Sequence, residues 1–131
     1  MFATGDSASM SQIWDMTIYT VNKPTAEQSA KWMAETMKQR CIVDLDWALG
    51  TLNMSDLPTP YGMGDGSIKN VACPVALTQA DKDVVVPAFM VMSNATALGE
   101  KATVLPYENC GHSPMVDCPD KLANDVVTFF G

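Results

Sequence analysis

The sequence has a single histidine and little positive charge. Eight Lys and Arg residues stand against fifteen Asp and Glu, which gives a net charge of −7. The basic residues are scattered singly, so they form no stripe that could neutralise phosphates or anionic lipid. One histidine is also too few for a His-based metal centre. We therefore expect no nucleic acid partner, no membrane partner, no metal and no other cofactor.

Long apolar runs are missing too, as is any close pair of cysteines. No run approaches the roughly 18 residues that a membrane-spanning helix needs. The first twelve residues lack a basic segment followed by an apolar one, which is the pattern of a secretion signal. These absences favour a cytoplasmic protein. The cysteines, Cys41, Cys73, Cys110 and Cys118, show no C-x-x-C spacing, so we expect buried free thiols.

The first half of the chain is predicted to be mostly helical. Residues 25–41 open with a T-x-x-Q capping box and continue with apolar residues at helical spacing. Residues 42–52 carry a second helical pattern, and we expect the two helices to pack in antiparallel contact. Residues 17–21 are β-branched and aromatic, which fits either a short strand or an extended arm. Residues 57–67 hold three Gly and two Pro, which predicts a loop or hinge.

The second half alternates short apolar runs with helical patterns. Residues 74–78 and 102–107 have the composition of buried strands. A helix is expected between them, beginning near Pro87 and ending at Gly99, and a last helix begins at Pro119. Apolar residues recur along this last helix and predict a buried stripe, formed by Leu122, Ala123, Val126, Val127, Phe129 and Phe130. The order strand, helix, strand, helix predicts a parallel α/β layer.

A polar loop follows each predicted strand, and the two loops carry Asp81, Asp83 and His112. In a parallel α/β sheet both loops lie at the carboxyl ends of the strands, where ligand-binding and catalytic residues are usually found. An imidazole can take the proton of a hydroxyl nucleophile, and a carboxylate behind it fixes the tautomer. Asp81 and Asp83 compete for the place of that carboxylate. The alternative is a surface histidine beside ordinary turn carboxylates.

A succession of short motifs between Val71 and Gly131 resembles the C-terminal segment of an α/β-hydrolase. The motifs are Cys73-Pro74-Val75-Ala76-Leu77, Asp83-Val84-Val85-Val86-Pro87, Gly111-His112-Ser113-Pro114, Cys118-Pro119-Asp120 and Phe129-Phe130. The resemblance implies that Asp83 is the acid and His112 the base of a catalytic triad. It also implies an α/β fold with a partial, hydrolase-like parallel sheet of few strands and flanking helices. Residues 1–70 resemble a helical cap, and residues 71–131 the hydrolase segment itself.

The nucleophile of that family has no clear counterpart here. The family places it in a G-x-S-x-G turn between a buried strand and a helix. The nearest string is Gly5-Asp6-Ser7-Ala8-Ser9, in which Ser9 replaces the last glycine. Too few residues precede and follow it for the strand and the helix. A polar N-terminal turn or cap is therefore the favoured interpretation, and Ser7 is a weak candidate nucleophile.

Two functions follow from these observations. The first is hydrolysis of an ester or related acyl bond, with His112 and Asp83 in the chain and the nucleophile supplied from elsewhere. The alternative is a truncated, inactive module that binds a small apolar ligand or a protein partner. The chain is then a fragment, a subunit completed by another chain, or a remnant. The first strand would lack a neighbour, so we expect a homo-oligomer or a chain that supplies the missing N-terminal half.

Overall fold

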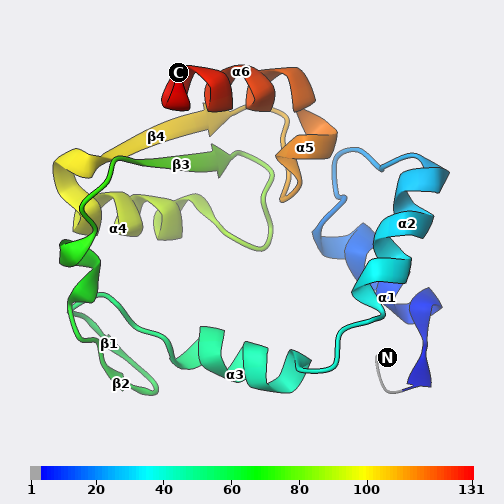
Figure 1. The fold of residues 1–131 in the computed structure, drawn as a ribbon, viewed down its shortest axis with the longest axis horizontal. Helices are drawn as coiled ribbons and strands as arrows, with labels where there is room; N and C mark the ends of the chain where they lie inside the picture. Colours follow the sequence, from blue (N-terminus) through cyan, green and yellow to red (C-terminus); the bar gives the residue numbers. More distant parts are fainter. Residues whose placement is uncertain (1–3) are drawn as a thin grey trace.

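The computed structural model describes residues 4–131, which combine helices with a small parallel sheet (Figure 1). The α/β class is therefore as predicted. The elements in chain order are α1 (Ser7–Thr17), α2 (Ala26–Thr36), α3 (Ile42–Thr51), β1 (Pro58–Thr59), β2 (Gly62–Met63), the 3-10 turn η2 (Ser67–Asn70), β3 (Val75–Ala80), α4 (Ala88–Leu98), the 3-10 turn η3 (Gly99–Lys101), β4 (Ala102–Tyr107), α5 (Pro114–Asp117) and α6 (Pro119–Phe130). Within residues 4–131, no helix has the length and apolar character needed to cross a membrane.

The sheet consists of β3 and β4, which run parallel from the pair Val75–Ala102 to the pair Ala80–Tyr107. Helix α6 covers one face and α4 the other (Figure 1). Proline and glycine set the helix boundaries as predicted. Pro87 precedes α4, and Gly99 ends it with a positive φ of 64°. Pro119 is the first residue of α6, where its missing N–H costs nothing.

Helix α2 begins at its predicted cap but ends at Thr36, before the expected end at residue 41, and its expected antiparallel contact with α3 is wrong. Thr25 and Gln28 make the reciprocal hydrogen bonds of a capping box. Instead of facing α3, α2 stacks Trp32 on Tyr19, with ring centroids 6.3 Å apart. Tyr19 also meets Trp14 of α1 edge to face at 5.8 Å. These aromatic contacts hold α2 near α1, whereas α3 lies apart from both helices (Figure 1).

The N-terminal segment forms helix α1 where a polar turn was expected, and residues 18–21 of the expected strand or arm form a turn and bends. Asp6 caps α1 by accepting a hydrogen bond from the Ser9 N–H at 3.0 Å, so the expected cap is present. That cap starts a helix which continues to Thr17 and buries Met10. The segment after α1 joins no sheet. The expected loop at residues 57–67 contains the short antiparallel pair β1–β2.

The apolar core of the described residues is small. Its buried side chains are Met10, Tyr19, Val91, Tyr107 and Cys110. The stripe of α6 that the sequence predicted to be buried is largely uncovered, with Val127 71% and Phe130 81% exposed. The accessible surface is 8949 Å², whereas a compact chain of this mass has about 6,700 Å². Two strands are too few to cover the apolar faces of the helices around them.

Candidate functional site

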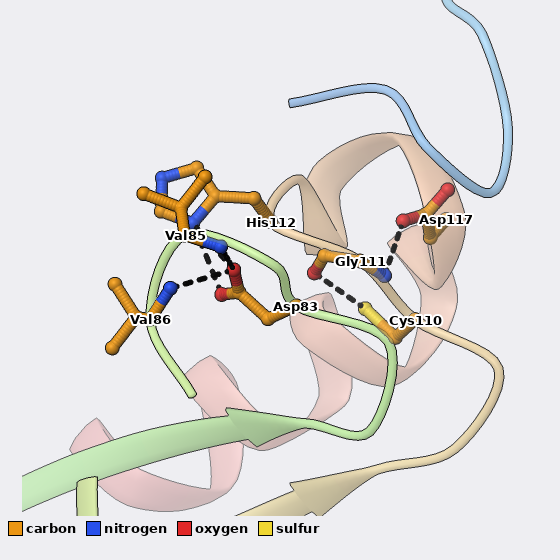
Figure 2. Close-up of polar contacts among 7 residues, drawn as sticks. All are labelled: Asp83, Val85, Val86, Cys110, Gly111, His112 and Asp117. Carbon is orange, nitrogen blue, oxygen red and sulfur yellow. Dashed lines mark hydrogen bonds and ion pairs between the residues drawn. The ribbon is translucent and has the colours of Figure 1, made fainter. Parts of the chain in front are cut away.

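Asp83 and His112 meet at the carboxyl edge of the sheet, although 29 residues separate them (Figure 2). Asp83 lies in the turn after β3, and His112 in the loop after β4. The Nδ1 atom of His112 is 3.0 Å from Oδ2 and 3.2 Å from Oδ1 of Asp83. The carboxylate side chain is 11% exposed and the imidazole 31%. The parallel strands thus bring together the two residues singled out in the sequence.

The Asp83 carboxylate is fixed by the main chain of its own turn. Its Oδ1 accepts hydrogen bonds from the N–H groups of Val85 at 2.8 Å and Val86 at 2.9 Å (Figure 2). Partial burial raises the pKa of this carboxyl, but the hydrogen bonds from Val86, His112 and Val85 outweigh it and leave the pKa below its ordinary value. Asp83 is therefore ionised at neutral pH and can only accept hydrogen bonds.

The contact with Asp83 determines which nitrogen of the neutral His112 ring carries the proton. Because an ionised carboxylate is only an acceptor, Nδ1 must carry the proton of the neutral ring. The other nitrogen, Nε2, points away from Asp83 (Figure 2) and is left as an acceptor. A pocket of about 150 Å³ lies against the ring, lined by Thr78, Ala80, Asp83, Val86, Gly111, His112 and Pro114. The ring thus presents an unprotonated nitrogen on the side away from Asp83 and lines a small cavity.

Asp81, the competing carboxylate, has a different task. Its Oδ1 accepts a hydrogen bond from the Cys110 N–H at 3.0 Å. Its own N–H donates to the Tyr107 carbonyl, and the next N–H, of Lys82, donates to the Cys110 carbonyl. Asp81 therefore fastens the two loops to each other, and Asp83 is the carboxylate that faces the ring.

Asp117 is a further residue of the site, which the sequence analysis did not single out. Its Oδ2 accepts from the Gly111 N–H at 2.8 Å (Figure 2), and its Oδ1 from the Asn22 N–H at 2.9 Å. One carboxylate thus holds the backbone beside His112 and ties the N-terminal segment to it. The approach is close, because a Cβ at position 111 would lie 2.7 Å from the Thr20 hydroxyl. The hydrogen-bond partners of Asp117 are main-chain groups that lie six and 95 residues away in the sequence, so no local motif reveals them.

The four thiols are all free but differ in exposure. Cys41 and Cys73 are exposed, so the expectation that they are buried is wrong. Cys110 is fully buried at the end of β4, between the loops of Asp81 and His112. Burial, reinforced by the neighbouring Cys118 thiol, raises the pKa of Cys110 to about 12. A thiolate there is strongly disfavoured.

This difference predicts a labelling pattern for the folded chain. With Ellman's reagent at neutral pH, Cys41 and Cys73 react first, and Cys110 reacts at least about a hundredfold more slowly because it is neither accessible nor ionised. Mass spectrometry of timed samples assigns each site, and unfolding in urea exposes all four thiols as the control. Labelling of Cys110 at the rate of Cys73 in the native chain contradicts the packing described here.

Among the described residues, the site has neither a nucleophile placed on a turn beside His112 nor a metal centre. Ser7 is exposed at the start of α1 and does not line the pocket beside His112. Thr78 has the one hydroxyl among the residues lining that pocket, but it lies inside β3 instead of on a turn. Among residues 4–131, no group of three or more His, Cys, Asp or Glu side chains could hold a metal ion.

No family model and no curated protein matches this sequence.

Proposed function

We propose that this chain contributes the acid and the base of an α/β-hydrolase triad, which hydrolyses an ester or a related acyl bond. The observation that carries the proposal is the contact between Asp83 and His112 Nδ1, with Nε2 directed away from the carboxylate. In such a triad, Nε2 takes the proton of the attacking hydroxyl and later gives it to the leaving group. Asp83 holds the ring in the required tautomer and stabilises the cation that forms.

The order of the elements supports the same proposal. The acid follows β3 and the base follows β4, its parallel neighbour, which is the chain order of acid and base in α/β-hydrolases. Residues 71–131 then correspond to the end of that fold, and the helices before them to a cap. This correspondence rests on the motifs in the sequence and on the arrangement of two strands and two helices.

The nucleophile is proposed to come from a polypeptide segment outside residues 4–131. It must bring a hydroxyl to within about 2.6–3.2 Å of Nε2. The His112 side chain is 31% exposed and its Nε2 points away from Asp83, which leaves room for such an approach. The substrate's acyl carbon would then lie next to the attacking oxygen, near the pocket of about 150 Å³ that His112 lines.

The experiment that tests the proposal uses p-nitrophenyl acetate. Water can replace the missing hydroxyl with so activated an ester, and His112 then acts as the general base. We expect slow turnover that falls at least about a hundredfold in the His112→Ala variant. Because exposed thiols are acylated by this reagent, the assay is run in a chain with Cys41→Ser and Cys73→Ser. Equal rates with and without the imidazole contradict the proposed role of His112.

A second candidate function is an inactive module that binds a small apolar ligand. It is favoured by an apolar pocket of about 430 Å³ between the sheet and α6, lined by residues that include Val75, Leu105, Leu122 and Phe129. Such a module would bind an apolar fluorescent probe equally well with and without His112. Probe binding together with ester turnover that ignores His112→Ala would favour this function over hydrolysis.

A further inference from the structure

The two outer edges of the β3–β4 sheet differ in their capacity to pair with another strand. In β4 the Tyr107 carbonyl faces β3, because it accepts from the Asp81 N–H at 3.0 Å. Main-chain groups alternate in direction along a strand, so Pro106 faces outward. Proline has no N–H to donate, and natural edge strands use it to prevent pairing. The β4 edge is therefore protected.

The outer edge of β3 has no such protection. The same alternation turns the main-chain N–H and C=O groups of Ala76 and Thr78 outward. Residues 75–80 contain no proline and no charged side chain. Among the described residues, β4 is the one strand that pairs with β3. This edge is an open template for a further strand.

Apolar side chains lie uncovered on both sides of the β3 edge. On the α4 side, Phe89 is 72% exposed and borders a cavity with Val75 and Leu77. On the α6 side, Phe130 is 81% exposed beside the pocket that includes Ala76 and Thr78. A strand added here would be buried on both faces.

The described chain exposes more surface than a compact monomer of its mass. The accessible surface of 8949 Å² exceeds the roughly 6,700 Å² expected of a compact monomer by about a third. A standard interface covers about 800 Å² on each partner, and obligate homodimers cover more. The excess, which is spread over the whole described chain, is larger than the area that one two-fold interface covers.

We propose that two copies of this chain pair through their β3 edges in antiparallel orientation. This pairing needs none of the acyl chemistry proposed above, but it occupies the strand edge at which a missing N-terminal half would also pair. A two-fold axis at Leu77 places Ala76 of each copy opposite Thr78 of the other. Their outward N–H and C=O groups then form hydrogen-bonded pairs, and the Leu77 side chains meet at the axis. The product is a four-stranded sheet with protected β4 strands at both edges. The apolar side chains beside β3 are covered by the same contact.

Sedimentation velocity of the purified chain at micromolar concentration tests this pairing. We expect a dimer, and we expect Ala76→Pro to weaken association at least about tenfold, because proline removes an outward N–H without touching the β4 side. Ala76→Ser, which keeps the N–H, should remain dimeric. Protection of Cys110 from labelling checks that each variant is folded. A monomeric parent chain, or a folded Ala76→Pro variant that still dimerises, overturns the proposal.

A cysteine at the proposed axis tests the register. Opposed residues of a non-hydrogen-bonded antiparallel pair have Cα atoms about 4.5 Å apart, within disulfide range. In a chain with Cys41→Ser and Cys73→Ser, we expect Leu77→Cys to give a covalent dimer on mild oxidation. Leu105→Cys in β4 is the matched control and should remain uncrosslinked. Crosslinking of the Leu105→Cys chain with none at position 77 overturns the assignment to the β3 edge.

Discussion

Replacing Asp83 by Asn is expected to lower the His112-dependent cleavage of p-nitrophenyl acetate by about a hundredfold, the lower range of what a positioned general base contributes. The substitution keeps the size of the side chain but removes its charge. An amide can present an N–H to Nδ1, and the ring then adopts the tautomer with Nε2 protonated. A protonated Nε2 has no lone pair with which to accept a proton. The initial rate of p-nitrophenolate release measures the effect.

Asp81→Asn is the matched control for that substitution. Asp81 lies two residues earlier in the same turn, is also a carboxylate, and accepts a hydrogen bond from the Cys110 N–H instead of from the ring. An amide oxygen can accept the same bond, so we expect a far smaller change in rate. If Asp81→Asn slows cleavage as much as Asp83→Asn, the proposal that Asp83 fixes the tautomer of His112 is contradicted.

Replacing Asp117 by Ala is expected to lower the free energy of unfolding by about 2–4 kcal/mol, because it removes two hydrogen bonds to a charged acceptor. One of them holds the backbone beside His112 and the other holds Asn22. The N-terminal segment should then detach more often. Urea unfolding followed by tryptophan fluorescence gives the free energy, and limited proteolysis near Asn22 reports the detachment.

Asp120 provides the control for the Asp117 substitution. It is an exposed carboxylate in the first turn of α6, where it interacts favourably with the positive end of the helix. Asp120→Ala should therefore cost less than about 1 kcal/mol and leave the proteolysis pattern unchanged. Equal losses for the two variants contradict the bridging role of Asp117.

Much of the second half of the fold could be predicted from the sequence, because strong local signals agree there with the tertiary structure. Pro87, Gly99 and Pro119 set helix boundaries through their own backbone preferences, whatever surrounds them. Strands that alternate with helices form a parallel layer, and loops after neighbouring parallel strands share one edge. For this reason Asp83 and His112 could be expected to meet despite their separation in sequence. Their catalytic roles stay predictions.

The first half depends on contacts that the sequence does not reveal. Residues 17–21 have the composition of a strand, but no strand lies beside them, and the cap at Asp6 starts a helix that includes Thr17. Helix α2 packs beside the N-terminal segment because Trp32 stacks on Tyr19. The direction of the turn after β3 decides which of the two carboxylates faces the ring, and in that turn the Val85 and Val86 N–H groups donate hydrogen bonds to the Asp83 carboxylate.

The burial of α6 could not be derived from its periodicity alone. Its apolar stripe predicts a buried face, but the elements present cover only part of it, and Phe130 stays largely exposed. Periodicity reports which face of a helix is apolar, whereas burial depends on what packs against it. Phe130 borders the pocket between α6 and the sheet, so the proposed further strand would lie beside this exposed part of the stripe.

The protonation state of His112 tests the proposed acid–base pair most directly, and as the only histidine it gives unambiguous signals. Nitrogen-15 NMR of the labelled chain distinguishes protonated from unprotonated ring nitrogens. In the neutral ring we expect Nδ1 to carry the proton and Nε2 to be bare, with the reverse after Asp83→Asn. A neutral ring protonated at Nε2 in the parent chain would contradict the proposed pairing and, with it, the role of His112 as a base.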